Sequence, residues 1–411
     1  MQIKFKKASI EKYKSIRSPV NINGFSKFNI LVGPNNAGKT NVLDALELIF
    51  NPKKESLHRK EAKIDIVLEV EGEEKLFNYS QKKIRPSLSK KSRLIRINDS
   101  ISIKKIATEE LQRFKDQYES DYRKLSSTIE EYFQDIQMSE DLFKANIKTK
   151  DGKKSLKRMG DGFKRLFVIL FYIYHPEYDI ILIDEPELHL HPSVIKKFLK
   201  ILNKEEVDTQ VLMTTHHPTM VQAKFLDKTW RIARDDSHST SIYKFNEKSS
   251  LDIDRFVQEI NDDNSAMLFA DKVLLVEGVS DSILMRELID KFYTGREDIK
   301  VVYSGGVGDI DLYEKVCEIF NIPYKVMIDG DMLEMYWQKK FGKKKSPRKE
   351  VKRDLLEKEN IFVLKGDLED NYPKKYQKRD TKPLNALFAG NKINESDFSN
   401  MSELKRVIEN L

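Results

Sequence analysis

Short apolar runs recur along the chain, and most of them are separated by segments whose apolar residues follow helical spacing. Residues 28–32 form a run that leads into a glycine-bearing loop, and helical spacing continues from Val42 until it stops before Pro52. The other runs predict strands at residues 64–70, 99–103, 178–183, 210–213, 273–276, 299–303, 324–328 and 361–364. Because strands alternate with helices, the pattern predicts an α/β protein with mixed or parallel sheets.

An amphipathic stripe with three- and four-residue steps predicts one long helix in the first half of the chain. Its members are Leu111, Phe114, Tyr118, Tyr122, Leu125, Ile129, Tyr132 and Ile136. We expect an inserted helical arm over about residues 105–150 that packs on its own domain, with dimerisation or DNA clamping as the alternative. The strand and helix pattern begins afresh from Lys272, after a predicted helix at 253–269, which predicts two domains, 1–265 and 266–411.

Composition places only broad limits on the partners. The 411 residues carry a net charge of +7 from 73 basic and 66 acidic side chains, a modest excess that favours an anionic partner without establishing one. The single cysteine, Cys317, excludes an intramolecular disulfide and fits a buried position in a reducing compartment. The longest apolar run, residues 166–174, is too short to span a bilayer, so we expect a cytoplasmic protein with no membrane partner.

The loop after the strand at 28–32 carries the first chemical motif. Residues 33–40, Gly-Pro-Asn-Asn-Ala-Gly-Lys-Thr, fit the P-loop pattern between a strand and a helix. The amides of Asn35, Asn36, Ala37 and Gly38 would surround the β-phosphate of ATP. Lys39 would neutralise the β- and γ-phosphates, and the Thr40 hydroxyl would bind Mg²⁺.

Three further segments follow in a defined order. A glycine-bearing helix start contains Gly160 and Gly162, where free amides would meet an anion. The strand at 180–183 ends in Asp184, a candidate Mg²⁺ ligand, and Glu185, a candidate to orient the attacking water. The strand at 210–213 leads to His216.

This order resembles the ABC-type ATPases. In that family the glycine-rich signature of one subunit closes over the γ-phosphate held by the other, and a histidine senses that phosphate. The segment around Gly160 lacks the family's usual serine and glutamine. We prefer His216 to His217 as the sensing histidine, because it aligns with the family's Thr-His pattern.

The residues after the acidic strand end narrow the resemblance. The run 184–192, Asp-Glu-Pro-Glu-Leu-His-Leu-His-Pro, resembles the OLD family, named for overcoming lysogenization defect. His189 and His191 have the spacing of metal ligands, but the resemblance implies that this segment lies at a dimer interface rather than in a zinc site.

A second set of acids follows two strands in the C-terminal half. Glu277 follows the strand at 273–276, with Asp281 shortly after it, and Asp329 and Asp331 follow the strand at 324–328. Hard divalent cations prefer several carboxylate oxygens, and the ends of neighbouring strands can supply them together. Either half alone is ordinary turn chemistry.

Together these acids resemble the Toprim domain over about residues 271–375. The resemblance implies that Glu277, Asp281, Asp329 and Asp331 hold one or two Mg²⁺ or Mn²⁺ ions that act on a phosphodiester. It also implies that the loop Ser304-Gly305-Gly306 approaches the cluster and that Glu369 is a further ligand. OLD nucleases use a late lysine near the scissile phosphate, for which Lys365, Lys374 and Lys375 remain equal candidates.

A basic run follows the second set of acids. Residues 339–353 contain Lys339, Lys340, Lys343, Lys344, Lys345, Arg348, Lys349, Lys352 and Arg353 against the single acid Glu350. Such a run is commonly a solvated loop, but its place after the acids favours contact with a nucleic-acid backbone.

The resemblance as a whole implies an OLD-like ATP-dependent DNA endonuclease, an ABC-type P-loop ATPase followed by a Toprim nuclease domain. In such an enzyme nucleotide binding in a homodimer or higher homo-oligomer gates cleavage. The resemblance also implies a setting in antiviral defence or DNA repair, with a partner subunit or RNA as additions to the assembly. The alternative is a regulatory ATPase or scaffold whose Toprim domain binds nucleic acid without cleaving it. A topoisomerase or primase would need further domains, for which this length leaves little room.

Overall fold

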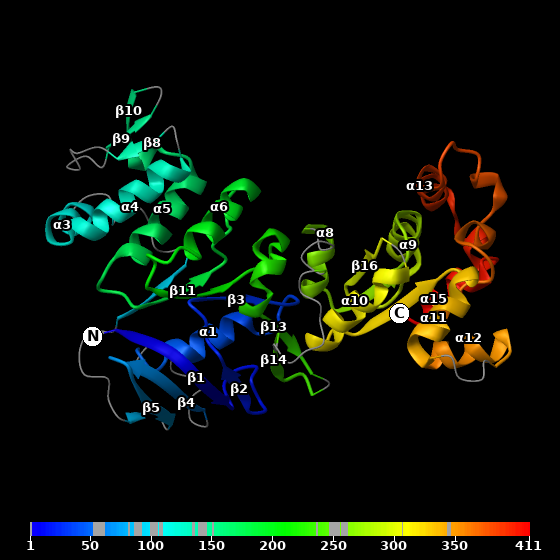
Figure 1. Ribbon diagram of the computed structural model, residues 1–411, viewed down its shortest axis with the longest axis horizontal. Coiled ribbons are helices and arrows are strands. Elements are labelled where there is room, and N and C mark those ends of the chain that lie inside the picture. Colours follow the sequence, from blue (N-terminus) through cyan, green and yellow to red (C-terminus); the bar gives the residue numbers. More distant parts are fainter. Residues whose placement is uncertain are drawn as a thin grey trace. The chain divides into compact units, whose positions relative to one another are not determined.

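The chain forms two compact units, Met1–Val221 with Phe225–Lys244 and Gln222–Lys224 with Phe245–Leu411. The computed structural model (Figure 1) describes residues 2–51, 62–80, 83–85, 93–98, 106, 110–133, 136–138, 146–149, 152–235, 237–245, 255, 262–305, 307–342 and 347–411. The predicted domain boundary between residues 265 and 266 stays a prediction. Residues 256–261, just before it, lie outside the described residues. The predicted α/β class is confirmed.

A six-stranded sheet organises the first unit, in the order β14-β13-β3-β12-β11-β7. All neighbouring pairs are parallel except β13 with β14. Its strands are β3 (Phe28–Val32), β7 (Leu94–Ile97), β11 (Ile180–Asp184), β12 (Gln210–Thr214), β13 (Thr229–Arg234) and β14 (Thr240–Lys244). Every residue of β3 and β12 is buried, as expected for central strands covered on both faces.

An antiparallel sheet lies on the other side of α1 (Lys39–Glu47), in the order β2-β1-β4-β5-β6. Its strands are β1 (Ile3–Glu11), β2 (Val20–Asn23), β4 (Lys63–Val70), β5 (Glu73–Ser80) and β6 (Lys83–Arg85). One apolar core joins β1, β4, α1 and the central sheet, so α1 is held between two sheets. This packing fixes the start of α1 next to the end of β3.

The inserted arm differs from the single long helix predicted for it. Two helices, α3 (Leu111–Gln117) and α4 (Glu119–Tyr132), meet at Tyr118, whose backbone is not helical and whose hydroxyl donates to Glu177. Ile136 belongs to a strand, in a small sheet of β8 (Ile136–Met138), β9 (Asn146–Thr149) and β10 (Gly152–Ser155). The stripe nevertheless faces its own unit, because Phe114 packs edge-on against Phe171 of α5 (Asp161–Tyr174).

Most of the predicted strands are present within one or two residues. The strand predicted at 99–103 lies outside the described residues, as does most of the helix predicted at 253–269. The short strand β7 was missed, because its four residues include a charged arginine within a basic stretch. The first unit also contains the helix α6 (Pro192–Leu202) and the 3₁₀ helices Leu156–Arg158 and Pro218–Met220. A further 3₁₀ helix, Ala223–Lys228, begins in residues assigned to the second unit.

The second unit is built on a four-stranded parallel sheet, in the order β16-β15-β17-β18. Its strands are β15 (Lys272–Val276), β16 (Ile299–Tyr303), β17 (Tyr324–Ile328) and β18 (Ile361–Val363). Its helices are α8 (Asp262–Ser265), α9 (Val279–Phe292), α10 (Val307–Ile319), α11 (Leu333–Phe341), α12 (Lys349–Lys358), α13 (Lys382–Lys392), α14 (Glu395–Ser399) and α15 (Ser402–Glu409). The chain steps from β15 to β16 and then returns to β17 on the other side of β15. The ends of β15 and β17 therefore flank a switch point, where ligands bind in such sheets.

Candidate functional site

The P-loop joins β3 to α1 through two glycines that the geometry requires. Gly33 has a φ of 136°, and a Cβ there would lie 1.9 Å from the carbonyl oxygen of Ile232. Gly38 has a φ of 104°, and a Cβ there would lie 2.4 Å from Oγ1 of Thr240. No side chain caps the start of α1. Its first amides are therefore available to an anion.

Lys39 is almost fully buried beneath this loop. Its Nζ donates to the carbonyl oxygens of Gly33 at 2.8 Å and Pro34 at 2.9 Å. Burial lowers the pKa of Lys39 to about 8, although Glu185 and Glu187 oppose the shift. The ammonium group is thus removed from water and held at the loop, where a bound phosphate would favour its charged form.

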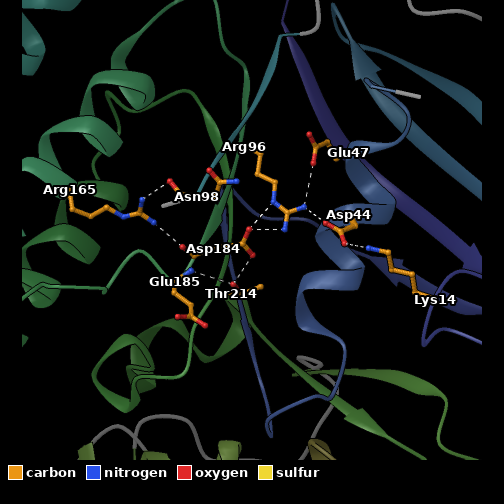
Figure 2. Close-up of polar contacts among 9 residues, drawn as sticks. All are labelled: Lys14, Asp44, Glu47, Arg96, Asn98, Arg165, Asp184, Glu185 and Thr214. Carbon is orange, nitrogen blue, oxygen red and sulfur yellow. Dashed lines mark hydrogen bonds and ion pairs between the residues drawn. The ribbon is translucent and has the colours of Figure 1, made fainter. Parts of the chain in front are cut away.

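Parallel pairing aligns the ends of β11 and β12, where Asp184 pairs with Thr214 in register. Asp184 Oδ1 accepts from the Thr214 hydroxyl at 3.3 Å, and its Oδ2 accepts from the Arg96 guanidinium (Figure 2). Arg96 also pairs with Asp44, one helical turn after Thr40 on α1. The structure therefore ties the predicted Mg²⁺ ligand Asp184 to the helix that carries Thr40.

Glu185 and His216 come together from neighbouring strand ends. His216 Nε2 lies 3.5 Å from Oε1 of Glu185. Burial, followed by the charge of Lys39, lowers the pKa of His216, so its ring is neutral at pH 7. His217 instead caps the 3₁₀ helix Pro218–Met220, its ring accepting from the Thr219 amide. Of the two histidines, His216 is the one at the acidic strand end.

Glu187 is a site residue that sequence reasoning missed. Its buried carboxylate accepts from the Thr215 hydroxyl at 2.6 Å and from the His216 amide at 3.0 Å. Its second oxygen is buried and has no hydrogen-bond partner among the described residues. Burial raises the pKa of Glu187. The only signal was its place in the Glu-Pro-Glu run, and its role here is to fix the loop that presents His216.

The two signature glycines have different surroundings. Gly160 precedes α5 without a side-chain cap, and a Cβ there would meet nothing within 4 Å. Gly162 lies against the chain itself, since a Cβ there would be 2.5 Å from the His189 carbonyl oxygen. His191 caps α6 by accepting from the Ser193 amide. Among the described residues, no histidine belongs to a group that could hold a metal ion.

The second unit gathers carboxylates at the ends of neighbouring parallel strands. Asp329 and Asp331 follow β17, and Asp367 follows β18. One carboxylate oxygen from each of these three residues lies within 4.8 Å of the others. Sequence reasoning missed Asp367, although it also follows a predicted strand, because the acids after that strand form a run from which only Glu369 was chosen.

Glu277 and Asp281 add to the same field of negative charge. Burial raises the pKa of Glu277, and the charges of Asp281, Asp331 and Asp367 raise it further. Burial raises the pKa of Asp281 to about 6 and that of Asp329 to about 8, with Asp281 and Glu277 as the next causes for Asp329. These five acids repel one another, as carboxylates do when they share a site without a cation.

Several carboxylate oxygens of this cluster have no partner. Glu277 Oε2, Asp329 Oδ1 and Glu369 Oε1 are buried and accept no hydrogen bond from any described residue. Unpaired buried oxygens are costly unless something compensates them. An oxygen-only donor set of this kind suits Mg²⁺ or Mn²⁺. The residues present therefore fit the divalent cations that the fold family implies.

Two of the three candidate lysines pair with acids outside the cluster, and the third, Lys374, is exposed. Lys365 pairs with Glu403 at 3.0 Å and Lys375 with Asp397 at 2.7 Å. Lys382, which sequence reasoning missed, pairs with Glu369 at 3.1 Å and also feels the charge of Asp367 and Asp329. Lys382, on the first turn of α13, thus pairs with an acid beside the cluster, whereas Lys365 and Lys375 pair elsewhere.

The remaining predicted elements lie in different settings. Ser304 is buried, and its amide donates to the Val276 carbonyl at 3.1 Å, so its loop meets the strand that ends at Glu277; Gly306 lies outside the described residues. In the basic run, Lys339 pairs with Asp311, Lys340 with Glu314 and Lys352 with Glu334. These three lysines are neutralised within the chain. Lys343, Lys344 and Lys345 lie outside the described residues.

A pH dependence follows from the setting of Lys39. The pKa of Lys39 is about 8 without nucleotide, and a bound phosphate raises it, so binding takes up a proton above pH 8. We expect affinity for a non-hydrolysable ATP analogue to fall roughly tenfold between pH 7 and pH 9. Fluorescence titration at each pH measures this. A flat profile, matching that of Lys39→Arg, would contradict the assignment.

Two family models match different segments of the chain. A family model described as an AAA ATPase domain matches residues 1–84 and 68–221, more than half of the chain. A model described as the TOPRIM domain of overcoming lysogenization defect protein-like sequences matches residues 268–331.

Two curated relatives are both named OLD nuclease. An OLD nuclease of Thermus scotoductus is 30% identical over 162 residues, which cover 37% of this chain and 31% of that protein. The Old nuclease of Escherichia phage P2 is 28% identical over 166 residues, which cover 38% of this chain and 28% of that protein. The chain thus spans less than a third of the length of each of these relatives.

Among solved structures, the SMC head domain from Thermotoga maritima aligns with a TM-score of 0.41 and 16% identity. That alignment covers 60% of this chain and all of the SMC chain. Within the described part of the present chain, no helix has the length and apolar character needed to cross a membrane.

Proposed function

The chain belongs to the family of AAA-type ATPases that carry a TOPRIM domain like that of the OLD proteins, and from this we propose that it is an ATP-dependent DNA endonuclease. Nucleotide binding and hydrolysis in the first unit gate divalent-metal-dependent cleavage of phosphodiesters by the second. The working form is a homodimer, completed by a partner subunit or RNA where one exists. Antiviral defence or DNA repair is the setting that the resemblance implies.

The acidic cluster carries the nuclease half of the proposal. Asp329, Asp331 and Asp367 converge from two strand ends, and buried oxygens of Glu277 and Asp329 lack any partner in the described part of the chain. Mg²⁺ or Mn²⁺ held there would activate water and stabilise the leaving oxygen. Glu277, Asp281 and Glu369 would complete the ligand set, and the pairing of Glu369 with Lys382 would hold that lysine near the scissile phosphate.

The P-loop carries the ATPase half. The amides of residues 35–38 bind the phosphates, and Lys39 neutralises them from beneath the loop. Thr40 and Asp184 would hold the Mg²⁺ that accompanies ATP. Glu185 orients the attacking water, and His216, placed by Glu187, contacts the γ-phosphate. Gly160, at the uncapped start of α5, serves the nucleotide of the second subunit, with Gly162 beside it.

Incubation with supercoiled plasmid tests the proposal directly. We expect Mn²⁺ to support conversion to the nicked circle, EDTA to stop it, and ATP to change its rate. Tight DNA binding with no strand cleavage under any of these conditions would favour the alternative, a regulatory ATPase whose TOPRIM domain only binds nucleic acid.

Lys382 is expected to matter for cleavage but not for metal binding. Removing the ammonium group in Lys382→Ala leaves the carboxylates in place and removes a cation near the scissile phosphate, so cleavage should fall about tenfold to a hundredfold. Mn²⁺ affinity, measured by calorimetry, should not weaken. Lys365→Ala and Lys375→Ala are the matched controls, and a larger loss in either would overturn the choice of Lys382.

A further inference from the structure

Arg96 occupies a position that the proposed ATP site does not explain. It lies on β7, the edge strand that pairs in parallel with β11, and β11 ends in Asp184. Its side chain is only 7% exposed. Buried arginines in proteins are paired with carboxylates, so the question is which carboxylates Arg96 holds and what they do.

Figure 2 shows the Arg96 guanidinium between the acidic strand end and the P-loop helix. Its Nε and Nη2 both donate to Asp184 Oδ2, at 2.8 and 2.7 Å. Its Nη1 pairs with Asp44 and lies 3.3 Å from Oε2 of Glu47, both on α1. Lys14 also pairs with Asp44. The fork of one arginine therefore spans the two elements that would share the Mg²⁺ of the nucleotide.

The donors in this group occupy the Asp184 oxygens that a further cation would need. Asp44, Glu47 and Asp184 carry three negative charges, against the positive charges of Arg96 and Lys14. Burial disfavours the charge of Arg96, but Asp184 and Asp44 outweigh it and raise its pKa, so Arg96 is a permanent cation. Of the two Asp184 oxygens, Oδ2 receives two N–H donors and Oδ1 faces the Thr214 hydroxyl. A divalent cation needs the same lone pairs.

We propose that Arg96 is the resident counter-ion of Asp184, and that Mg²⁺ arriving with the nucleotide competes with Arg96 for this carboxylate. The inference rests on the proposed ATP site and adds a positioning residue to it. Asp44 and Glu47 keep hold of Nη1, so the guanidinium retains partners on α1 when it gives up Asp184. Arg96 thereby sets the Mg²⁺ concentration at which nucleotide is bound productively.

A second arginine keeps the strand end in place independently. Arg165 of α5 donates to the Asp184 carbonyl oxygen and to the Asn98 carbonyl oxygen, each at 3.0 Å. The backbone at Asp184 is thus held even when Arg96 is changed. Substitution of Arg96 should therefore alter the competition for the carboxylate more than the position of the strand.

The chain offers a matched control on the same pair of strands. Arg93 precedes β7 and pairs with Asp179, which directly precedes β11. The two arginines thus make equivalent ion pairs at opposite ends of β7 and β11. Arg93→Gln removes a pair remote from the P-loop, whereas Arg96→Gln removes the pair at the acidic strand end.

The test is the Mg²⁺ concentration that gives half-maximal binding of a fluorescent, non-hydrolysable ATP analogue. Arg96→Gln should lower this concentration roughly threefold to tenfold, since one competing ion pair is lost. Arg96→Lys keeps the charge but loses the forked guanidinium, so its half-maximal Mg²⁺ concentration should lie between those of Arg96→Gln and the wild type. Arg93→Gln should match the wild type. If Arg96→Gln does not fold, as judged by thermal melting, Arg96→Lys carries the test with a shift of about twofold.

An unchanged or higher Mg²⁺ requirement in the folded Arg96 variants would overturn the proposal. The same result in Arg93→Gln as in Arg96→Gln would also overturn it, because the effect would then be general loss of rigidity. Absence of nucleotide binding by the wild type is a different outcome, since it refutes the ATP site itself.

Discussion

Asp329→Ala combined with Asp331→Ala is expected to abolish plasmid cleavage, with a loss of at least about a hundredfold. The two substitutions remove two of the three carboxylates whose oxygens lie within 4.8 Å of one another. Mn²⁺ binding to the second unit, followed by calorimetry, should be lost in parallel. Nucleotide binding should be unchanged, because the P-loop belongs to the other compact unit.

The same double variant should be more stable than the wild type when metal is absent. The pKa of Asp329 is about 8 in the folded protein, against an ordinary value of 3.8, so the folded state holds a proton that the unfolded chain releases. Stability of the metal-free wild type therefore falls as pH rises toward 8, and the variant lacks the part of this fall that Asp329 contributes. Asp354→Ala, at an exposed acid of α12, is the control. Cleavage that survives the double substitution would refute the assignment of these acids.

Lys39→Ala should weaken nucleotide binding at least about a hundredfold, because the phosphates lose their only buried ammonium partner at the loop among the described residues. Equilibrium binding of the fluorescent analogue measures the loss. Lys27→Ala is a matched control, since Lys27 lies just before β3 and also donates to a backbone carbonyl, that of Lys204. Mn²⁺ binding to the second unit should be unaffected in both variants. An unaltered nucleotide affinity in Lys39→Ala would remove the ATP site from the account.

The strands that position both sites were predictable because they are buried on both faces. The run at 28–32 matches β3, every residue of which is buried, and acids stand at the ends of β11, β15 and β17, whose apolar residues are mostly buried. A continuous apolar run that ends in glycine or acid is a strong local signal. The P-loop glycines were predictable for a different reason. Their role is set by the local backbone conformation, which the motif itself specifies.

The missed residues depend on contacts between distant segments. The break at Tyr118 follows from its packing on His175 and its bond to Glu177, neither of which periodicity reveals. Lys382 lies beyond the three candidate lysines in the sequence and reaches the acids only because α13 packs along α9. Arg96 looked like one more charge in a basic stretch. Its partners Asp44 and Asp184 lie 52 and 88 residues away in the sequence.

Acids from separate strand ends are expected to form one divalent-cation site. Crystals grown with Mn²⁺ and measured at a wavelength where manganese scatters anomalously test this most directly. We expect an anomalous peak within coordination distance of Asp329, Asp331 and Asp367, with Glu277 or Asp281 completing the shell. Carboxylates that turn apart under these conditions, with no manganese among them, would contradict the claim.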